Sequence, residues 1–149
     1  MIPGGESTTI SRLITQKGLK EPILKKAKQG TPIFGTCAGM VLLASSGSEE
    51  VEKANQSLLG LIDAKVNRNA FGRQRNSFHI NIPLKFLDKP YKTVFIRAPA
   101  YTEVGEKVDI LGKISDKVIA ARQKNILVTA FHPELVDDNR IYNYFLEFI

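Results

Sequence analysis

The sequence lacks the features that mark secreted, disulfide-bonded or membrane-spanning chains. Its 149 residues include one cysteine, Cys37, so no internal disulfide can form. The longest apolar runs, residues 39–44 and 126–131, are far too short to span a bilayer. No charged-then-apolar leader opens the chain, so we expect a cytoplasmic protein that does not contact membranes. No internal repeat, low-complexity tract or linker is present, which predicts one domain over residues 1–149.

The composition is ordinary for a globular domain. Hydrophobic residues make up 43% and charged residues 24%, which argues against disordered and fibrous classes. Lys and Arg total 21 against 15 Asp and Glu, for a formal charge of +6. A basic balance can indicate a nucleic-acid partner. The lysines are scattered, however, and no zinc or RNA-binding signature occurs, so we interpret the charge as a solvated helix face and expect no nucleic-acid partner.

Apolar spacing predicts helices and strands that alternate at first, with strands prevailing later. The expected helices are residues 8–17, with Ser7 or Thr8 as N-cap, and residues 21–29, 38–44 and 139–149. The expected strands are residues 31–35, 61–66, 78–82, 93–96, 108–114, 118–121 and 126–131. Residues 45–57 are polar and are expected to form a surface connection. This order indicates an α/β sheet with an antiparallel extension.

The most informative stretch is Gly35-Thr-Cys-Ala-Gly39, where an apolar strand runs directly into a helix. The serine version of this pattern is the nucleophile elbow of hydrolases. Small flanking residues permit a tight turn around a strained central residue. The helix N-terminus should favour the thiolate of Cys37, and the Ala38 amide could stabilise an oxyanion. The alternative is that Cys37 is a small buried hydrophobic residue.

A thiolate nucleophile needs a base, and the chain has two histidines. His132 follows an apolar strand and precedes Pro133 and Glu134, so the glutamate can orient the imidazole. His79 alternates with apolar residues and has no acidic neighbour, so we interpret it as a residue on the surface of a sheet. The sequence therefore favours His132 as the base.

A second glycine-rich element, Pro3-Gly-Gly-Glu-Ser-Thr8, precedes a helix. It could bind a phosphate, because helix N-termini bind anions. It lacks the lysine of a Walker motif, and Glu6 argues against a phosphate in direct contact. Its backbone amides are better suited to donate to an oxyanion or to a polar substrate.

Taken together, these elements resemble the class I (triad) glutamine amidotransferases, on Gly35-Thr-Cys-Ala-Gly39 and His132-Pro-Glu134. Three further strings resemble the glutaminase subunits of pyridoxal 5′-phosphate synthase: Pro3-Gly-Gly-Glu-Ser-Thr-Thr9, Arg68-Asn-Ala-Phe-Gly-Arg-Gln74 and Phe95-Ile-Arg-Ala-Pro99. The resemblance covers the whole chain. It implies a flavodoxin-like, mostly parallel sheet flanked by helices.

The resemblance also implies a role for each matching residue. The implied catalytic residues are Cys37, His132 and Glu134, and the implied oxyanion donors are the amides of Gly5 and Ala38. The implied glutamine-binding residues are Gly5, Glu6, Ser7, Arg68, Ile96 and Arg97. Without the resemblance, Arg68 and Arg97 would be interpreted as ordinary surface arginines.

The implied reaction is hydrolysis of L-glutamine to L-glutamate and ammonia through a Cys37 thioester. The implied partner is the barrel-shaped synthase subunit, which receives the ammonia and makes pyridoxal 5′-phosphate. Docking to that subunit is expected to order the oxyanion strand and to activate the glutaminase. The family needs no metal and no tightly bound cofactor, since pyridoxal phosphate is its product.

This sequence departs from the family pattern in two respects. The family has a strand–helix–strand unit of roughly 30–45 residues before Pro-Gly-Gly-Glu. We therefore expect this chain to be N-terminally truncated relative to the family, with an exposed apolar sheet edge. Asn76 stands where an acidic residue is common, and Ala100 where a histidine is frequent. Both changes could alter docking.

Three alternatives remain open at the level of sequence. The chain could be the glutaminase subunit of a histidine, guanine-nucleotide or tryptophan pathway. It could instead be a non-catalytic, truncated subunit that only binds a partner. A Cys–His hydrolase or chaperone of related fold fits less well, because it does not explain Pro3-Gly-Gly-Glu-Ser7 together with Arg68.

Overall fold

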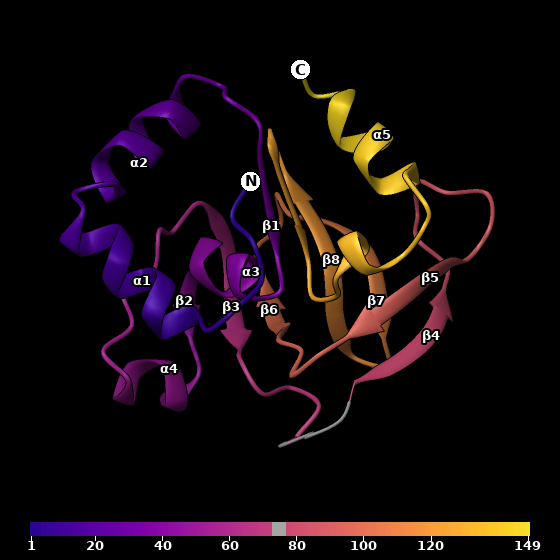
Figure 1. Ribbon diagram of the computed structural model, residues 1–149, viewed down its shortest axis with the longest axis horizontal. Coiled ribbons are helices and arrows are strands. Elements are labelled where there is room, and N and C mark those ends of the chain that lie inside the picture. Colours follow the sequence, from indigo (N-terminus) through magenta and orange to yellow (C-terminus); the bar gives the residue numbers. More distant parts are fainter. Residues whose placement is uncertain (73–76) are drawn as a thin grey trace.

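The computed structural model describes residues 1–72 and 77–149 (Figure 1). In chain order its elements are α1 (Ser7–Gln16), α2 (Lys20–Lys28), β1 (Ile33–Thr36), α3 (Ala38–Leu43), β2 (Ala44–Gly47), α4 (Glu49–Lys53), β3 (Ile62–Asn67), β4 (Phe78–Ile82), β5 (Tyr91–Phe95), β6 (Ala100–Val104), β7 (Asp109–Ile114), β8 (Lys117–Gln123), β9 (Ile126–Thr129), the 3-10 turn η1 (Pro133–Leu135) and α5 (Arg140–Leu146). Within these described ranges, no helix is long and apolar enough to cross a membrane.

A seven-stranded sheet forms the centre of the molecule. Its strand order is β1-β9-β8-β6-β3-β2, with β7 pairing with β8 outside this path. Strand β1 pairs with β9, and β2 with β3, in parallel. The β3–β6, β6–β8, β7–β8 and β8–β9 pairs are antiparallel, so the sheet is mixed. Strands β4 and β5 form a separate antiparallel pair. The expected α/β class with an antiparallel extension is confirmed, but the sheet is mixed where the resemblance implied a mostly parallel one.

Helices flank the central sheet. Figure 1 shows α1, α2 and α4 to the left of the sheet, and α5 in yellow to its right. The core between these layers is apolar, and Phe34, Leu42, Ile62, Leu127 and Phe131 are fully buried in it. Every residue of β1 and β9, at one end of the sheet, is buried, and both strands are mostly apolar because both of their faces are covered.

The N-terminal segment lies along β1. The Ile2 amide donates to the Phe34 carbonyl at 2.8 Å, and the Thr36 amide donates to the Ile2 carbonyl at 3.1 Å. These bonds form a parallel bridge between Ile2 and Gly35. Because Gly4 and Gly5 follow Ile2 after a single residue, Pro3, this pairing brings them to the C-terminal end of β1, next to Cys37.

Three sequence expectations need correction. The N-cap of α1 is Glu6, whose carboxylate accepts hydrogen bonds from the amides of Thr8 and Thr9, and not Ser7 or Thr8. Residues 45–57 were expected to be a connection but contain most of β2 and all of α4. Strand β6 was not expected at all. Both β2 and β6 are short and lie next to β3, so pairing within the sheet overrides their weak apolar pattern.

Candidate functional site

Cys37 stands at the turn between β1 and α3. Its backbone has φ 48° and ψ −103°, a conformation that residues other than glycine rarely adopt. Close packing explains the flanking glycines. A Cβ on Gly35 would lie 2.5 Å from Leu43 Cδ1, and one on Gly39 would lie 2.2 Å from the Ile2 oxygen. The Gly-x-Cys-x-Gly pattern thus reflects a crowded turn around a strained cysteine.

Backbone groups surround the Cys37 sulfur. The backbone amides of Gly5 and Ala38 face it and lower the pKa of the thiol. On another side, Sγ lies 3.7 Å from the Ile96 carbonyl oxygen. The two amides belong to separate segments and both lie beside the sulfur, the region where an oxyanion hole would need its donors.

Burial raises the pKa of the Cys37 thiol to about 11. Desolvation is the largest cause, because the side chain is only 7% exposed. The two amides lower the pKa, and the Glu134 carboxylate raises it further. The sequence suggested that the helix N-terminus would favour the thiolate, but α3 has only six residues and burial dominates. Cys37 is thus a thiol at neutral pH in the ligand-free protein and needs a base.

His132 and Glu134 form a hydrogen-bonded pair directly after β9. His132 Nδ1 lies 2.7 Å from Glu134 Oε1, and the His132 amide donates to the Val94 carbonyl at 2.9 Å. The Nε2 atom of His132 is buried and has no hydrogen-bond partner among the described residues. With Nδ1 held by the carboxylate, Nε2 is the nitrogen left to exchange a proton.

Gly4 lies between Cys37 and His132. A Cβ on Gly4 would lie 2.5 Å from His132 Cε1 and 3.5 Å from Cys37 Cβ. The imidazole ring and the cysteine thus border the same residue, although they are 95 positions apart in the chain. Sequence reasoning did not single out Gly4, because its role depends on this close approach.

A cavity of about 460 Å³ opens beside the Cys37 sulfur. Every implied site residue except Glu134 lines it: Gly5, Glu6, Ser7, Cys37, Ala38, Arg68, Ile96, Arg97 and His132. Glu134 contacts His132 and does not line the cavity. The structure thus brings together residues from five separate parts of the chain.

Three further cavity residues, Val41, Asn69 and Pro99, were not proposed from the sequence. Val41 lies on the first turn of α3, one helical turn after Cys37. Asn69 and Pro99 belong to the two strings that carry the family resemblance, so their motif membership was the available signal. Asn69 is held by α4, since its Nδ2 donates to Glu50 Oε2 at 2.5 Å.

Charged groups stand at the mouth of the cavity. Glu6 Oε1 lies 3.4 Å from Arg68 Nη2. Hydrogen bonds from Thr8 and Thr9, with the Thr8 hydroxyl contributing most, lower the pKa of Glu6 to about 2. The cavity therefore offers a carboxylate and a guanidinium side by side, which suits a zwitterionic ligand.

Arg97 adopts φ 48°, another left-handed conformation at a residue other than glycine. This turn follows β5 and places the Ile96 carbonyl against the Cys37 sulfur. His79 lies on β4, opposite Val94 of β5, and is exposed, as expected for a residue on the surface of a sheet. Arg73 and Gln74 of the Arg68–Gln74 string, and Asn76, lie outside the described residues.

Comparisons with known proteins agree with this site. The model of the SNO glutamine amidotransferase family matches residues 1–149. The pyridoxal 5′-phosphate synthase subunit PdxT of Methanococcoides burtonii is 56% identical over 147 residues, which are 99% of this chain and 74% of that protein. The PdxT subunit of Archaeoglobus fulgidus has the same identity and coverage.

A solved structure gives the same result in three dimensions. A crystal structure of a glutamine amidotransferase matches with a TM-score of 0.89 and 41% identity, over 98% of this chain and 76% of that one. Since the family model covers the entire sequence, the chain belongs to the SNO glutamine amidotransferase family.

Proposed function

We propose that this chain is a glutaminase that hydrolyses L-glutamine to L-glutamate and ammonia, and that residues 1–149 act as one amidotransferase domain. The observation that carries the proposal is the cavity that Cys37 and His132 both line, with the amides of Gly5 and Ala38 beside the Cys37 sulfur. The family membership gives the same reaction class.

The reaction begins at Cys37. His132 Nε2 takes the thiol proton, and the thiolate attacks the side-chain amide carbon of glutamine. The Gly5 and Ala38 amides stabilise the oxyanion that forms. Glu134 holds His132 Nδ1, which keeps Nε2 directed to the reacting atoms and stabilises the imidazolium.

The second half of the reaction releases both products. His132 gives its proton to the amide nitrogen, the C–N bond breaks, and ammonia leaves a γ-glutamyl thioester on Cys37. His132 then takes a proton from water, whose oxygen attacks the thioester. The C–S bond breaks, glutamate leaves, and the Cys37 thiol is restored.

The charges at the cavity mouth fit the substrate. Glu6 is ionised at neutral pH, since its pKa is about 2, and Arg68 is a permanent cation. They suit the α-ammonium and α-carboxylate groups of glutamine. We propose Ser7, Ile96 and Arg97 as further contacts because they line the same cavity.

The partner we propose is the synthase subunit that makes pyridoxal 5′-phosphate. Two relatives at 56% identity are named as subunits of pyridoxal 5′-phosphate synthase, which motivates this assignment. In this proposal the synthase subunit receives the ammonia directly. No resident cofactor or metal takes part in the proposed steps.

The test measures glutamate release from glutamine with and without the synthase subunit. We expect release that depends on the synthase and is abolished in Cys37→Ala and His132→Gln. The variant His79→Gln is the matched control, because it removes the other histidine, which is exposed on β4. A folded wild-type chain that releases no glutamate in the presence of the synthase would contradict the proposal.

A further inference from the structure

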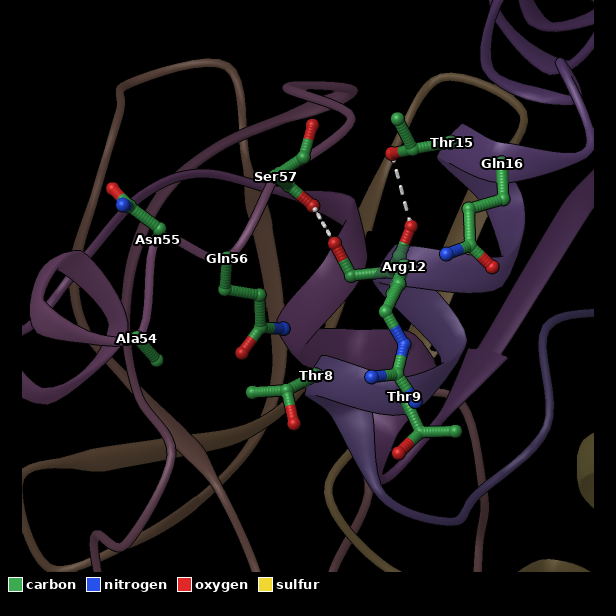
Figure 2. A pocket seen from close by; sticks show the side chains of 10 residues that line it. Thr8, Thr9, Arg12, Thr15, Gln16, Ala54, Asn55, Gln56 and Ser57 are labelled. Carbon is green, nitrogen blue, oxygen red and sulfur yellow. Dashed lines mark hydrogen bonds between the residues drawn. The ribbon is translucent and has the colours of Figure 1, made fainter.

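A second cavity of about 460 Å³ lies between α1 and the segment that follows α4 (Figure 2). The proposed reaction does not use it. Its wall includes Arg12 and Gln16 of α1, and Gln56 and Ser57 of the facing segment. Figure 2 shows the Gln56 side chain reaching from its own segment toward α1.

Polar contacts join α1 to this segment. Ser7 Oγ donates to Gln56 Oε1 at 3.2 Å, across 49 positions in the chain. Ser11 Oγ donates to the Ser57 carbonyl at 2.8 Å, and Lys20 Nζ donates to Ser57 Oγ at 3.0 Å. Ser7 and Ser11 are the buried residues of α1, so these hydrogen bonds help to position the helix together with the packing of Ile10 and Ile14 against the core.

The hydrogen bond between Ser7 and Gln56 joins a residue of the cavity beside Cys37 to a residue of the second cavity. Ser7 lines the cavity beside Cys37 and is only 6% exposed, while its hydroxyl proton is directed to Gln56 behind it. A hydroxyl has one proton and two lone pairs. With Oε1 of Gln56 facing Ser7, and not Nε2, which has no partner among the described residues, the Ser7 hydroxyl donates to Gln56 and is left to accept from a ligand in the cavity beside Cys37.

We propose that Gln56 is a positioning residue for substrate binding: it accepts the Ser7 proton and so makes Ser7 Oγ an acceptor for an N–H group of glutamine. This inference rests on the proposed function. Glutamine has two such donors, its α-ammonium and its side-chain NH₂. Gln56 itself does not line the cavity beside Cys37, so its effect passes through Ser7.

The test compares Gln56→Met, Gln56→Glu and Gln16→Met in the full chain with the synthase subunit. Methionine keeps the approximate length and removes the acceptor, whereas glutamate keeps an acceptor oxygen. We expect Gln56→Met to raise KM for glutamine roughly threefold to tenfold, the loss of one hydrogen bond, with kcat within about twofold. Gln56→Glu should stay within about twofold of wild type in KM. Gln16→Met is the matched control, because Gln16 lines the same second cavity without a bond to Ser7.

Two analogues identify the donor. 4-Carbamoylbutanoate lacks the α-ammonium group, and glutamate γ-methyl ester lacks the amide NH₂. Each is measured by its protection of Cys37 from alkylation in wild type and in Gln56→Met. If Ser7 accepts from the ammonium, the variant weakens protection by the ester alone. If it accepts from the amide, the variant weakens protection by carbamoylbutanoate alone.

Several results would overturn the inference. Equal KM values for wild type and Gln56→Met, or equal weakening of both analogues, would show that Gln56 does not direct the Ser7 proton. A failure of KM to recover in Gln56→Glu would have the same meaning. Failure of the proposed function gives a different result: the wild-type chain releases no glutamate, and glutamine does not protect its Cys37 from alkylation. In that case both the proposed function and this inference are wrong.

Discussion

Opposing effects act on the Cys37 sulfur. Two backbone amides favour the thiolate, while burial and the Glu134 carboxylate favour the thiol, and the thiol prevails. The two amides are too weak to ionise the cysteine of the free protein. In the proposed reaction they can stabilise the negative charge that develops on the oxyanion. In the proposed reaction the site therefore stabilises a transition state and does not hold a permanently reactive thiolate.

The raised pKa of Cys37 predicts slow alkylation of the free chain. With a pKa of about 11, the thiolate fraction at pH 8 is on the order of 100-fold below that of an exposed cysteine. We expect iodoacetamide to react correspondingly slowly at pH 8, and faster as the pH approaches 11. Mass spectrometry of the Cys37 peptide measures the rate. Fast reaction at pH 7 would show that the folded protein lowers this pKa.

The residue that caps α1, Glu6, also lines the proposed binding site. Glu6 caps the helix through the Thr8 and Thr9 amides and also faces Arg68. Its pKa is lowered from the ordinary value of 4.5 to about 2, chiefly by its hydrogen bond with the Thr8 side chain. A group with a lowered pKa stabilises the fold above its unfolded value, and this contribution disappears as the pH falls.

The Glu6 cap therefore predicts an acid-sensitive share of stability. Between about pH 5 and pH 2, wild type should lose this share, while Glu6→Gln should lose less over the same range. We expect a difference below about 1 kcal/mol, because the Glu6 side chain is half exposed. Urea unfolding at several pH values measures it. Glu103→Gln, which changes an exposed carboxylate, serves as the control. The prediction would be contradicted if the free energy of unfolding changed with pH equally in Glu6→Gln and in wild type.

At the scale of the whole molecule, Arg140 ties the C-terminal helix to β5. Its guanidinium donates to the carbonyls of Lys89 and Pro90 at 2.9 and 3.2 Å, and pairs with Asp138 at 2.6 Å. Tyr91, the first residue of β5, donates to the Asp138 carbonyl at 2.9 Å. These bonds anchor the chain that follows His132 and Glu134.

Loss of the Arg140 bonds should lower the free energy of unfolding. We expect Arg140→Gln to lower the free energy of unfolding more than the control does, since several hydrogen bonds of one guanidinium group are lost together. The control Lys85→Gln breaks only the exposed pair with Asp109 and should change it by less than about 0.5 kcal/mol. Thermal or urea unfolding of the two variants and of wild type measures these differences. Equal stability of the two variants would show that the Arg140 bonds contribute nothing net.

Apolar spacing and short apolar runs made most elements predictable from the sequence. Strands β1, β7 and β9 and helices α1, α2, α3 and α5 were expected within a few residues of their observed bounds. Strands β2 and β6 were not predicted. The Ala44-Ser-Ser-Gly47 segment has no strand pattern, and its pairing with β3 makes it a strand.

The sequence by itself determined the family and the chemistry, because Gly35-Thr-Cys-Ala-Gly39 and His132-Pro-Glu134 carry their turns and reacting groups in consecutive residues. Only the tertiary structure decided what depends on residues far apart in the chain. The pKa of Cys37 depends on burial, and the seating of Ser7 depends on Gln56, 49 positions away. Desolvation and long-range hydrogen bonds exist only once the chain has folded, so they cannot be predicted from a local sequence pattern.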